Sequence, residues 1–275
     1  MEINRKNVME VIEKSGLKPD KDYGQNYLLE PELAKRIIDL LEIKSGENVL
    51  EIGPGLGSLS HFLSLYSDSK ITLVDIDERM INFLRIIYNT NNISLVLNDI
   101  RKHDVSNYEK IVGNLPYNIT TETVVYLLEN AKKAKKMVLM CQAEAFPRFN
   151  DLSGKEYGPV SILVHLLGSS KRNFTVKPGS FYPIPKCSSV VFTIDLNKEN
   201  VREQSLAVYK FAKKMFLNRR KTIYNNLSSF LVNKDVAVDL LKQAGIDPSK
   251  RPEELPPSSF VTLYECVNKN SKLFY

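Results

Sequence analysis

Short apolar runs alternate with segments of helical periodicity over the first two-thirds of the chain. The apolar runs are Val49–Ile52, Ile71–Ile76, Ile93–Leu97, Ile111–Val112 and Met137–Met140. Apolar residues recur at helical spacing between them, in Leu59–Leu65, Met80–Ile87 and Thr123–Leu128. This alternation predicts βαβ units and a parallel sheet, which the runs Asn173–Val176 and Val190–Ile194 are expected to extend.

The pattern changes at a polar joint, Asp195–Asn200. Beyond it only helices are expected, at residues 203–216, 219–230, 234–243 and 258–268. The chain is therefore predicted to hold an α/β domain over residues 1–197, which begins with a polar N-terminal extension at 1–23. A small all-helical domain is predicted over residues 198–275.

Composition places the chain among soluble globular proteins. Of its 275 residues, 43% are hydrophobic and 25% are charged. No apolar run is long enough to span a bilayer, and the charged N-terminus lacks a secretory signal core. Three scattered cysteines and three scattered histidines suggest neither a disulfide framework nor a metal centre. A cytoplasmic location is expected, without metal or membrane.

The formal net charge of +6 is unevenly distributed. Residues 201–275 hold 13 basic and 7 acidic residues and so carry the whole excess. A basic domain is typical of a protein that binds nucleic acid. A surface charge that only keeps the protein soluble would give the same net charge.

A glycine-rich turn follows the first strand of the predicted sheet, in the stretch 49–57 that reads VLEIGPGLG. Glycines such as Gly53 and Gly55 let the backbone pass close to a ligand, and the helix that follows offers free N–H groups. The spacing G-x-G-x-G differs from the dinucleotide fingerprint G-x-G-x-x-G. The turn favours a nucleoside-bearing cofactor, although a tight strand–helix turn without a ligand would also fit.

Carboxylates follow the next two strands. Asp75 is placed to accept hydrogen bonds from both ribose hydroxyls of NAD or of S-adenosylmethionine, while Asp77 is predicted to cap the next helix. Asp99, after the third strand, can accept from an adenine amino group, or it is a turn residue or helix cap.

The fourth strand ends in Asn114-Leu115-Pro116-Tyr117. The Asn114 side-chain oxygen and the Leu115 carbonyl could hold both hydrogens of an exocyclic amine and so free its lone pair. Pro116 has no N–H to compete, and Tyr117 can stack on a flipped base. A plain proline turn is the alternative.

These residues resemble the motif of methyltransferases that act on adenine N6 in nucleic acids. Further segments narrow the resemblance to the rRNA adenine dimethyltransferase family. They are GQNYL at 24–28, QAE at 142–144 with Arg148, FYPIPK at 181–186, FLNRRKT at 216–222 with NNL at 225–227, and RPEEL at 251–255. The segments beyond residue 215 are similar to the C-terminal domain of the KsgA branch, which dimethylates two adjacent adenines in the hairpin loop near the 3′ end of 16S rRNA. The resemblance covers about residues 20–265.

The resemblance implies a Rossmann-like S-adenosylmethionine-dependent methyltransferase domain with a C-terminal helical domain. It places cofactor contacts at Asn26, Leu28, Gly53, Asp75, Asp99 and Asn114. Asp75 stands where the family usually has Glu, so the ribose contact is expected to be looser. Phe181 is expected to be a second stacking face for the adenine, with core packing as the alternative.

Two basic clusters are candidates for phosphate contacts. The first comprises Lys213, Lys214, Arg219, Arg220 and Lys221, for which RNA binding is favoured over a buried Arg220 paired with an acidic helix. The second, Lys132–Lys136, is as well explained as a solvated face.

The sequence thus predicts a monomeric enzyme that dimethylates 16S rRNA within the small ribosomal subunit, with a role in subunit biogenesis. A 23S rRNA methyltransferase of the resistance type and a catalytically idle rRNA-binding assembly factor remain alternatives. An NAD dehydrogenase is disfavoured by the glycine spacing and by the lack of a placed catalytic His or Lys.

Overall fold

The computed structural model describes residues 2–20, 23–116, 119–197, 199–231 and 235–269. The chain forms two compact units, Met1–Phe146 with Lys171–Leu196 and Pro147–Ser170 with Asn197–Tyr275. The segment 147–170 therefore groups with the C-terminal helices, whereas the sequence analysis put it in the sheet domain. The reason is packing, since Tyr157 and Ile162 are buried in one core with Val208 and Phe211.

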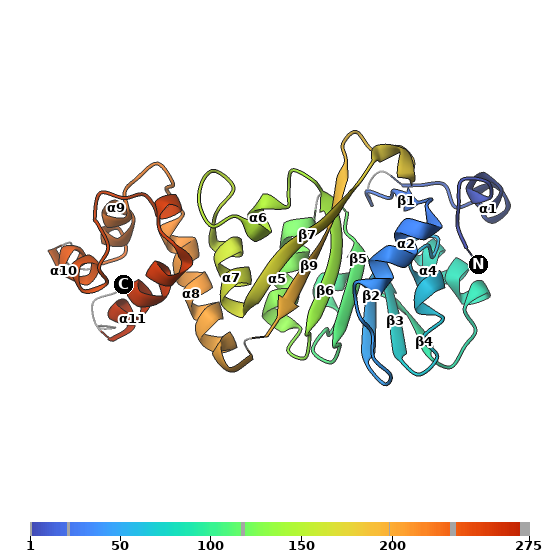
Figure 1. The fold of residues 1–275 in the computed structure, drawn as a ribbon, viewed down its shortest axis with the longest axis horizontal. Helices are drawn as coiled ribbons and strands as arrows, with labels where there is room; N and C mark the ends of the chain where they lie inside the picture. The colour runs from blue at the N-terminus through green and yellow to red at the C-terminus, as the bar shows by residue number, and fades with distance from the viewer. Residues whose placement is uncertain (1, 21–22, 117–118, 198, 232–234, 270–275) are drawn as a thin grey trace. The chain divides into compact units, whose positions relative to one another are not determined.

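The first unit is built on a seven-stranded sheet in the order β4-β3-β2-β5-β6-β9-β7 (Figure 1). Its strands are β2 (Asn48–Ile52), β3 (Lys70–Asp75), β4 (Ile93–Leu97), β5 (Lys110–Asn114), β6 (Lys136–Gln142), β7 (Gly168–Val176) and β9 (Ser189–Leu196). The pairs β2–β3, β3–β4, β2–β5 and β5–β6 are parallel, and β9 runs antiparallel to β6. Each apolar run named above lies in a strand, except that Ile76 follows the end of β3, so the expected parallel sheet is confirmed.

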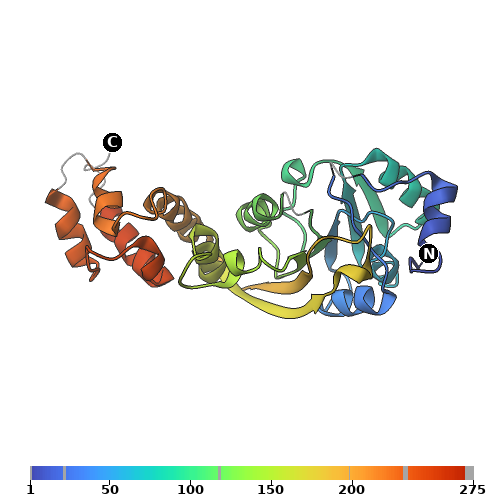
Figure 2. The ribbon, with the colours of Figure 1, turned by 90° about the horizontal axis from the view of Figure 1, so that it is seen from above.

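Helices cover both faces of this sheet (Figure 2). On one face α2 (Pro31–Asp39), α3 (Ser60–Leu63) and α4 (Glu78–Ile87) share a core with alternate strand residues such as Val49, Leu73 and Val112. On the other lies α5 (Thr120–Asn130). The chain enters α5 from β5, and the short helix η1 (Ile100–Lys102) follows β4.

The N-terminal extension is part of the folded unit. Helix α1 (Val8–Ser15) and its flanks bury Ile3, Val8, Ile12 and Leu17 against Tyr27, Leu56 and Met80. The short strand β1 (Tyr27–Leu28) then pairs antiparallel with β8 (Phe181–Tyr182), which follows η2 (Pro178–Ser180). The polar composition of residues 1–23 hides this small core because its buried apolar residues stand four or five positions apart.

The second unit is helical around a core of its own. Its helices are α6 (Pro147–Asn150), α7 (Pro159–Leu167), α8 (Arg202–Met215), α9 (Ile223–Ser228), α10 (Asp235–Gln243) and α11 (Pro257–Lys269), with short turns η3 (Glu199–Val201) and η4 (Pro252–Glu254). Helix α9 begins later than predicted because the Thr222 side chain accepts the backbone N–H of Asn225 and caps it there. In the described part of the chain, none of the helices combines the length and apolarity needed to cross a bilayer.

Candidate active site

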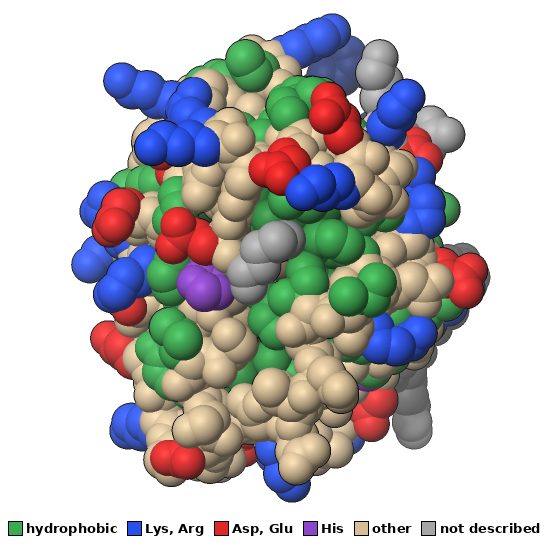
Figure 3. Space-filling view, turned by 90° about the vertical axis from the view of Figure 1, so that its right-hand side faces the viewer, with side chains coloured by type: hydrophobic (Ala, Val, Ile, Leu, Met, Phe, Trp, Pro, Cys, Tyr) green, Lys and Arg blue, Asp and Glu red, His purple; other side chains and the backbone are tan. Residues whose placement is uncertain are grey.

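A pocket opens where the carboxyl ends of β2 and β5 lie side by side, the point at which the strand order reverses and ligands bind in open α/β sheets. It holds about 820 Å³ of space, part of which is open to solvent. The face of the molecule shown in Figure 3 carries hydrophobic side chains near its centre and charged side chains of both signs around them. This face is therefore not a uniformly basic surface.

The glycine turn forms one wall of the pocket. Gly53 and Gly55 have φ angles of +63° and +53°, the left-handed region that side chains with a Cβ disfavour. A Cβ at Gly55 would stand 3.2 Å from the ring of Tyr27, so the turn also needs glycine for space. The Gly55 N–H points to the Asp75 carboxylate, with N and Oδ2 3.4 Å apart.

Asp75 ends β3 at the floor of the pocket and is 8% exposed. Its Oδ1 accepts the backbone N–H of Asp77 at 2.9 Å. Burial raises the pKa of the Asp75 carboxyl to about 6, although these backbone donors work against the shift. The carboxylate still lines the pocket, where it can accept a hydroxyl hydrogen bond. Asp77 caps α4 by accepting the Arg79 N–H, as predicted.

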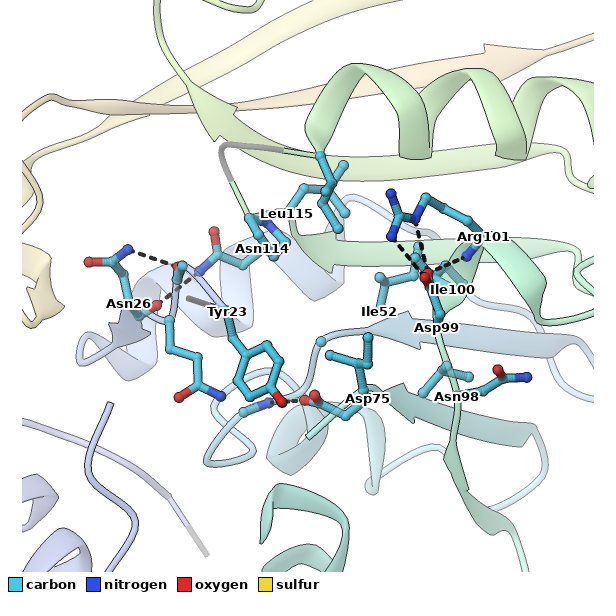
Figure 4. A pocket seen from close by; sticks show the side chains of 18 of the residues that line it. Tyr23, Asn26, Ile52, Asp75, Asn98, Asp99, Ile100, Arg101, Asn114 and Leu115 are labelled. Carbon is cyan, nitrogen blue, oxygen red and sulfur yellow. Dashed lines mark hydrogen bonds and ion pairs between the residues drawn. The ribbon is translucent and has the colours of Figure 1, made fainter. Parts of the chain in front are cut away.

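Asp99 lies in the same pocket but is already paired. Its oxygens accept the Arg101 backbone N–H at 2.9 Å and two guanidinium N–H groups at 3.1 and 2.8 Å (Figure 4). The Arg101 guanidinium holds the pKa of the Asp99 carboxyl below its usual range. Asp99 therefore caps η1, one of the two roles considered for it, and still faces the pocket.

Asn114 ends β5 beside the glycine turn that follows β2. Its Nδ2 donates to the carbonyl oxygen of Asn26 at 3.1 Å (Figure 4). The Asn26 Nδ2 in turn donates to the carbonyl of Gly24 at 3.1 Å. Because the Asn114 amide nitrogen is engaged, its Oδ1 is the atom left to meet a ligand, as an acceptor.

The backbone after Asn114 offers one further acceptor. The Pro116 carbonyl already accepts the Ile119 N–H at 3.2 Å and the Thr120 hydroxyl at 2.9 Å, which start α5. The Leu115 N–H donates to Met140 of β6, and the Leu115 side chain is buried. No hydrogen-bond donor from the described residues engages the Leu115 carbonyl. Tyr117 lies outside the described residues.

The segment 23–27 crosses the pocket and is held in place by Gln25. The Gln25 Nε2 donates to the Asp77 carboxylate at 2.9 Å, and its Oε1 accepts the Asp20 N–H and the Tyr27 hydroxyl. Arg79 donates to the same Asp77 carboxylate at 2.7 Å. This network ties the N-terminal segment to the turn that follows Asp75.

Sequence reasoning missed the apolar walls of the pocket. Tyr23, Ile76, Ile100 and Ile119 line it, and Ile76 is 49% exposed directly after Asp75. The tyrosine ring reaches across the pocket toward Asp75 in Figure 4. Ile76 was read as the last residue of its strand, yet an apolar residue beyond a strand-end carboxylate was an available signal.

Two of the residues predicted to contact ligands are buried in the fold. Leu28 and Phe181 are 4% and 1% exposed, face each other across the β1–β8 pair, and belong to the main core. The Leu28 carbonyl accepts the hydroxyl of Ser58, the residue after the glycine turn, at 2.7 Å, and a cofactor contact through the Leu28 backbone stays a prediction. Phe181 cannot stack on an adenine from this position, so core packing was the correct alternative for it.

The basic cluster of the second unit divides by role. Arg219 donates to the carbonyls of Gly154 and Tyr157, at 3.1 and 2.8 Å, and its guanidinium lies over the Phe216 ring. It is therefore a structural residue of this unit. Arg220 is exposed, so the alternative of a buried Arg220 paired with an acidic helix is wrong. Also exposed are Lys213, Lys214 and Lys221.

The other cluster, Lys132–Lys136, lies before and at the start of β6, at the amino end of the strands. Lys136 pairs with Glu42 and Asp195. Since β6 is seven residues long, this end lies about 20 Å from the pocket edge, and a solvated face fits it better than substrate contact. No group of His, Cys, Asp and Glu in the described ranges could hold a metal ion.

The parallel sheet with an antiparallel strand β9, the pocket at its switch point and the additional helices define the class. The protein is a Rossmann-like methyltransferase of the type that uses S-adenosylmethionine. Sequence comparison assigns the chain to one family within this class. The model of ribosomal RNA adenine dimethylase matches residues 16–269, and the chain belongs to this family.

Relatives agree with this assignment. Ribosomal RNA small subunit methyltransferase A of Clostridium botulinum (strain Langeland) is 34% identical, with 95% of this chain and 98% of the relative covered. The protein of the same name from Mycoplasma capricolum is 30% identical, with 91% and 98% covered. The chain is thus an rRNA adenine dimethyltransferase that acts on RNA, as the resemblance implied.

Solved structures share its fold. A dimethyladenosine transferase from Plasmodium falciparum is 25% identical and superposes with a TM-score of 0.77, covering 90% of this chain and 99% of that one. The 23S rRNA methyltransferase ErmE, 21% identical, has a TM-score of 0.66 over 88% and 99% of the chains. The second likeness shows a common fold and does not bear on the RNA target.

Proposed function

We propose that this enzyme dimethylates the N6 amines of two adjacent adenines in the 3′-terminal hairpin loop of 16S rRNA, within the small ribosomal subunit. The names of its relatives support the small subunit as the target. The observation that carries the chemistry is the hydrogen bond from Asn114 to Asn26, because it leaves the Asn114 oxygen as an acceptor beside the Leu115 carbonyl.

The pocket fits S-adenosylmethionine, which supplies an electrophilic methyl group on a sulfonium when bound. Asp75 would accept the ribose hydroxyls, Gly53 and Gly55 would let the backbone approach the ligand, and Ile76 and Ile100 would flank the adenine ring of the cofactor. Asp99 can still accept an amino group because Arg101 leaves it lone pairs.

Asn114 and Leu115 would prepare the substrate amine. In free adenine the N6 lone pair is delocalised into the ring and is a poor nucleophile. Two acceptors that hold both N–H hydrogens favour a pyramidal nitrogen whose lone pair points out of the ring plane. Catalysis then rests on positioning and electrostatics. The nitrogen–carbon bond forms as the carbon–sulfur bond breaks, and the surplus proton leaves the amine to water.

Methyl transfer to three RNAs in parallel tests the target. Under-methylated 30S particles, 23S rRNA and an unrelated RNA are incubated with labelled S-adenosylmethionine, and the modified bases are mapped by mass spectrometry. We expect dimethyladenine at two neighbouring positions of 16S rRNA. Label confined to 23S rRNA would contradict the proposed target and favour a resistance-type enzyme.

The Asn114→Ala variant tests the mechanism. It should bind RNA and keep its melting temperature, because Asn114 is half-buried at the pocket rim, and it should lose at least about 100-fold in kcat as a transition-state acceptor is removed. A kcat within threefold of the wild type would contradict the assigned role.

We further propose that the enzyme acts as a monomer in small-subunit biogenesis. Sedimentation of the enzyme alone should give the mass of one chain. Cells that carry only the Asn114→Ala variant should accumulate immature subunits. Comparing their amount with that in cells without the protein separates the effect of lost methylation from the effect of the lost protein.

A further inference from the structure

Ile184 is an exposed hydrophobic residue at the edge of the pocket-bearing unit. Its side chain is 70% exposed, although it lies between Pro183 and Pro185 in the segment 182–186, here called the rim loop. Single exposed hydrophobic residues are common on protein surfaces. Three further features distinguish this one: the anchoring of its loop, the pairing of that loop with the strand after Asn26, and the charge around it.

The rim loop is anchored on both sides. Tyr182 pairs with Tyr27 in the β1–β8 ladder, and the Leu29 N–H donates to the carbonyl of Ser180 at 2.9 Å. After the loop, the carbonyl of Ser188 accepts the Ala143 N–H at 3.0 Å. Two prolines restrict the backbone between these anchors. The exposed side chain is therefore held on a stiff support.

The same ladder places the rim loop beside the substrate acceptors. Tyr27 follows Asn26 directly, and the carbonyl of Asn26 is the group that orients the Asn114 amide. The residue that holds Asn114 thus directly precedes the strand that pairs with the rim loop. The loop therefore lies next to the segment that lines the pocket at Asn26 and Tyr27.

The charge of the two rims differs. The segment 171–186 contains four basic residues and no acidic residue, and Lys177 and Lys186 are exposed. On the rim near the ribose site, Asp20, Asp77 and Asp99 lie beside Arg79 and Arg101. A polyanion is attracted to the first rim and meets carboxylates at the second. RNA would therefore reach Asn114 past the rim loop.

We propose that Ile184 packs against the base next to the reacting adenine and occupies the gap left in the stack when that adenine is withdrawn into the pocket. Apolar side chains inserted beside an unstacked base are a known means of holding nucleic acid open. Lys177 and Lys186 contact the phosphates on either side. This inference rests on the proposed function, because it requires an adenine that leaves a stack to be methylated.

The test compares Ile184→Ala with Ile86→Ala, a matched control on α4 whose side chain is 84% exposed. The substrate is a hairpin RNA with the sequence of the methylated loop, and a second hairpin carries 2-aminopurine at the target base to report unstacking. We expect Ile184→Ala to lower kcat/KM for RNA about tenfold and to reduce the 2-aminopurine signal, since an apolar contact is lost. The affinity for S-adenosylmethionine and the melting temperature should not change, and Ile184→Leu should restore activity.

Equal kcat/KM and equal 2-aminopurine signals for Ile184→Ala and Ile86→Ala would overturn the inference. A wild-type enzyme that methylates a different RNA would contradict only the proposed target, and the same pair of variants is then compared on that RNA. If the wild type methylates no RNA, the 2-aminopurine signal on binding still decides whether Ile184 contacts the unstacked loop.

Discussion

Two buried carboxyl groups are expected to make cofactor binding and fold stability depend on pH. Asp75 lies in the pocket with a pKa raised to about 6, and Glu51, on β2, lies in the interior at 1% exposure with a pKa raised to about 8. Burial is the main cause in both cases. The two groups act on different properties, since Asp75 faces a ligand and Glu51 faces the Ser60 hydroxyl at 2.7 Å.

Cofactor binding should depend on the ionisation of Asp75. The ionised carboxylate would accept a ribose hydroxyl hydrogen bond, and protonation would remove an acceptor. The Kd for S-adenosylmethionine should therefore rise as the pH falls from 7 to 5, with a midpoint near pH 6. Titration calorimetry at several pH values measures it. Asp75→Asn should bind about tenfold more weakly at pH 7 and show no such midpoint; a midpoint that persists in this variant would assign it to another group.

Fold stability should depend on Glu51. Its pKa in the folded state lies above the ordinary value of 4.5, so its stabilising contribution is complete below that value and is lost as the pH rises through about 8. We expect the free energy of unfolding to fall by about 2 kcal/mol between pH 6 and pH 8 from this group. Urea unfolding of Glu51→Gln should show a smaller decrease over the same interval. Parallel pH profiles for the two proteins would refute the assignment.

At the scale of elements, the contact between β2 and β5 forms the pocket and depends on Gly113. A Cβ at this position would stand 3.0 Å from the Cβ and from the carbonyl oxygen of Ile52, and backbone cannot move aside as a side chain can. Gly53 directly follows Ile52, and Asn114 directly follows Gly113, so both pocket residues adjoin this contact. Strain here would therefore act on the fold and on the site together.

Gly113→Ala should destabilise the protein by about 1–3 kcal/mol, as overpacking does, and should also weaken S-adenosylmethionine binding. Thermal unfolding and calorimetry measure the two effects. Gly158→Ala is the matched control, because a Cβ there meets no atom within 4 Å. Equal melting temperatures for the two variants would show that β2 and β5 can separate without cost.

The turn between α8 and α9 gives a second prediction for elements. Arg219→Ala removes two hydrogen bonds to the carbonyls of Gly154 and Tyr157 and should lower the melting temperature by several degrees. Arg220→Ala, one residue away and exposed, should leave the melting temperature unchanged and weaken RNA binding. The reverse pattern, with stability lost at Arg220, would contradict the structural role of Arg219.

For the whole molecule, the location of the basic excess predicts which surface binds RNA electrostatically. Replacing Lys213, Arg220 and Lys221 by Gln should reduce the slope of log Kd for RNA against log salt by about 2–3, as three phosphate contacts are lost. The matched control replaces Lys132, Lys133 and Lys135 by Gln, which removes the same charge from exposed positions. Filter binding over a range of salt concentrations measures both slopes, and equal slopes would mean that only net charge matters.

Much of this protein could be predicted from the order of its residues. The strands at 49–52, 71–76, 93–97 and 137–140 were placed within about two residues, because strands buried in a parallel sheet are continuous apolar runs. The turn at Gly53–Gly57, the carboxylates after two strands and Asn114 also follow from local sequence, since each lies at a strand end. The parallel sheet brings those ends to one edge.

The tertiary structure decided the remainder, because packing depends on residues far apart in the chain. Phe181 is aromatic and begins one of the motifs that carry the resemblance, but its pairing with Leu28 buries it. Arg219 and Arg220 are neighbours of identical chemistry, and only the distant carbonyls of Gly154 and Tyr157 distinguish them. The segment 147–170 joined the helical unit for the same reason, through the core of Tyr157 and Ile162. Local sequence thus determined the elements and the chemistry at their ends, while long-range packing determined which side chains remain free to act.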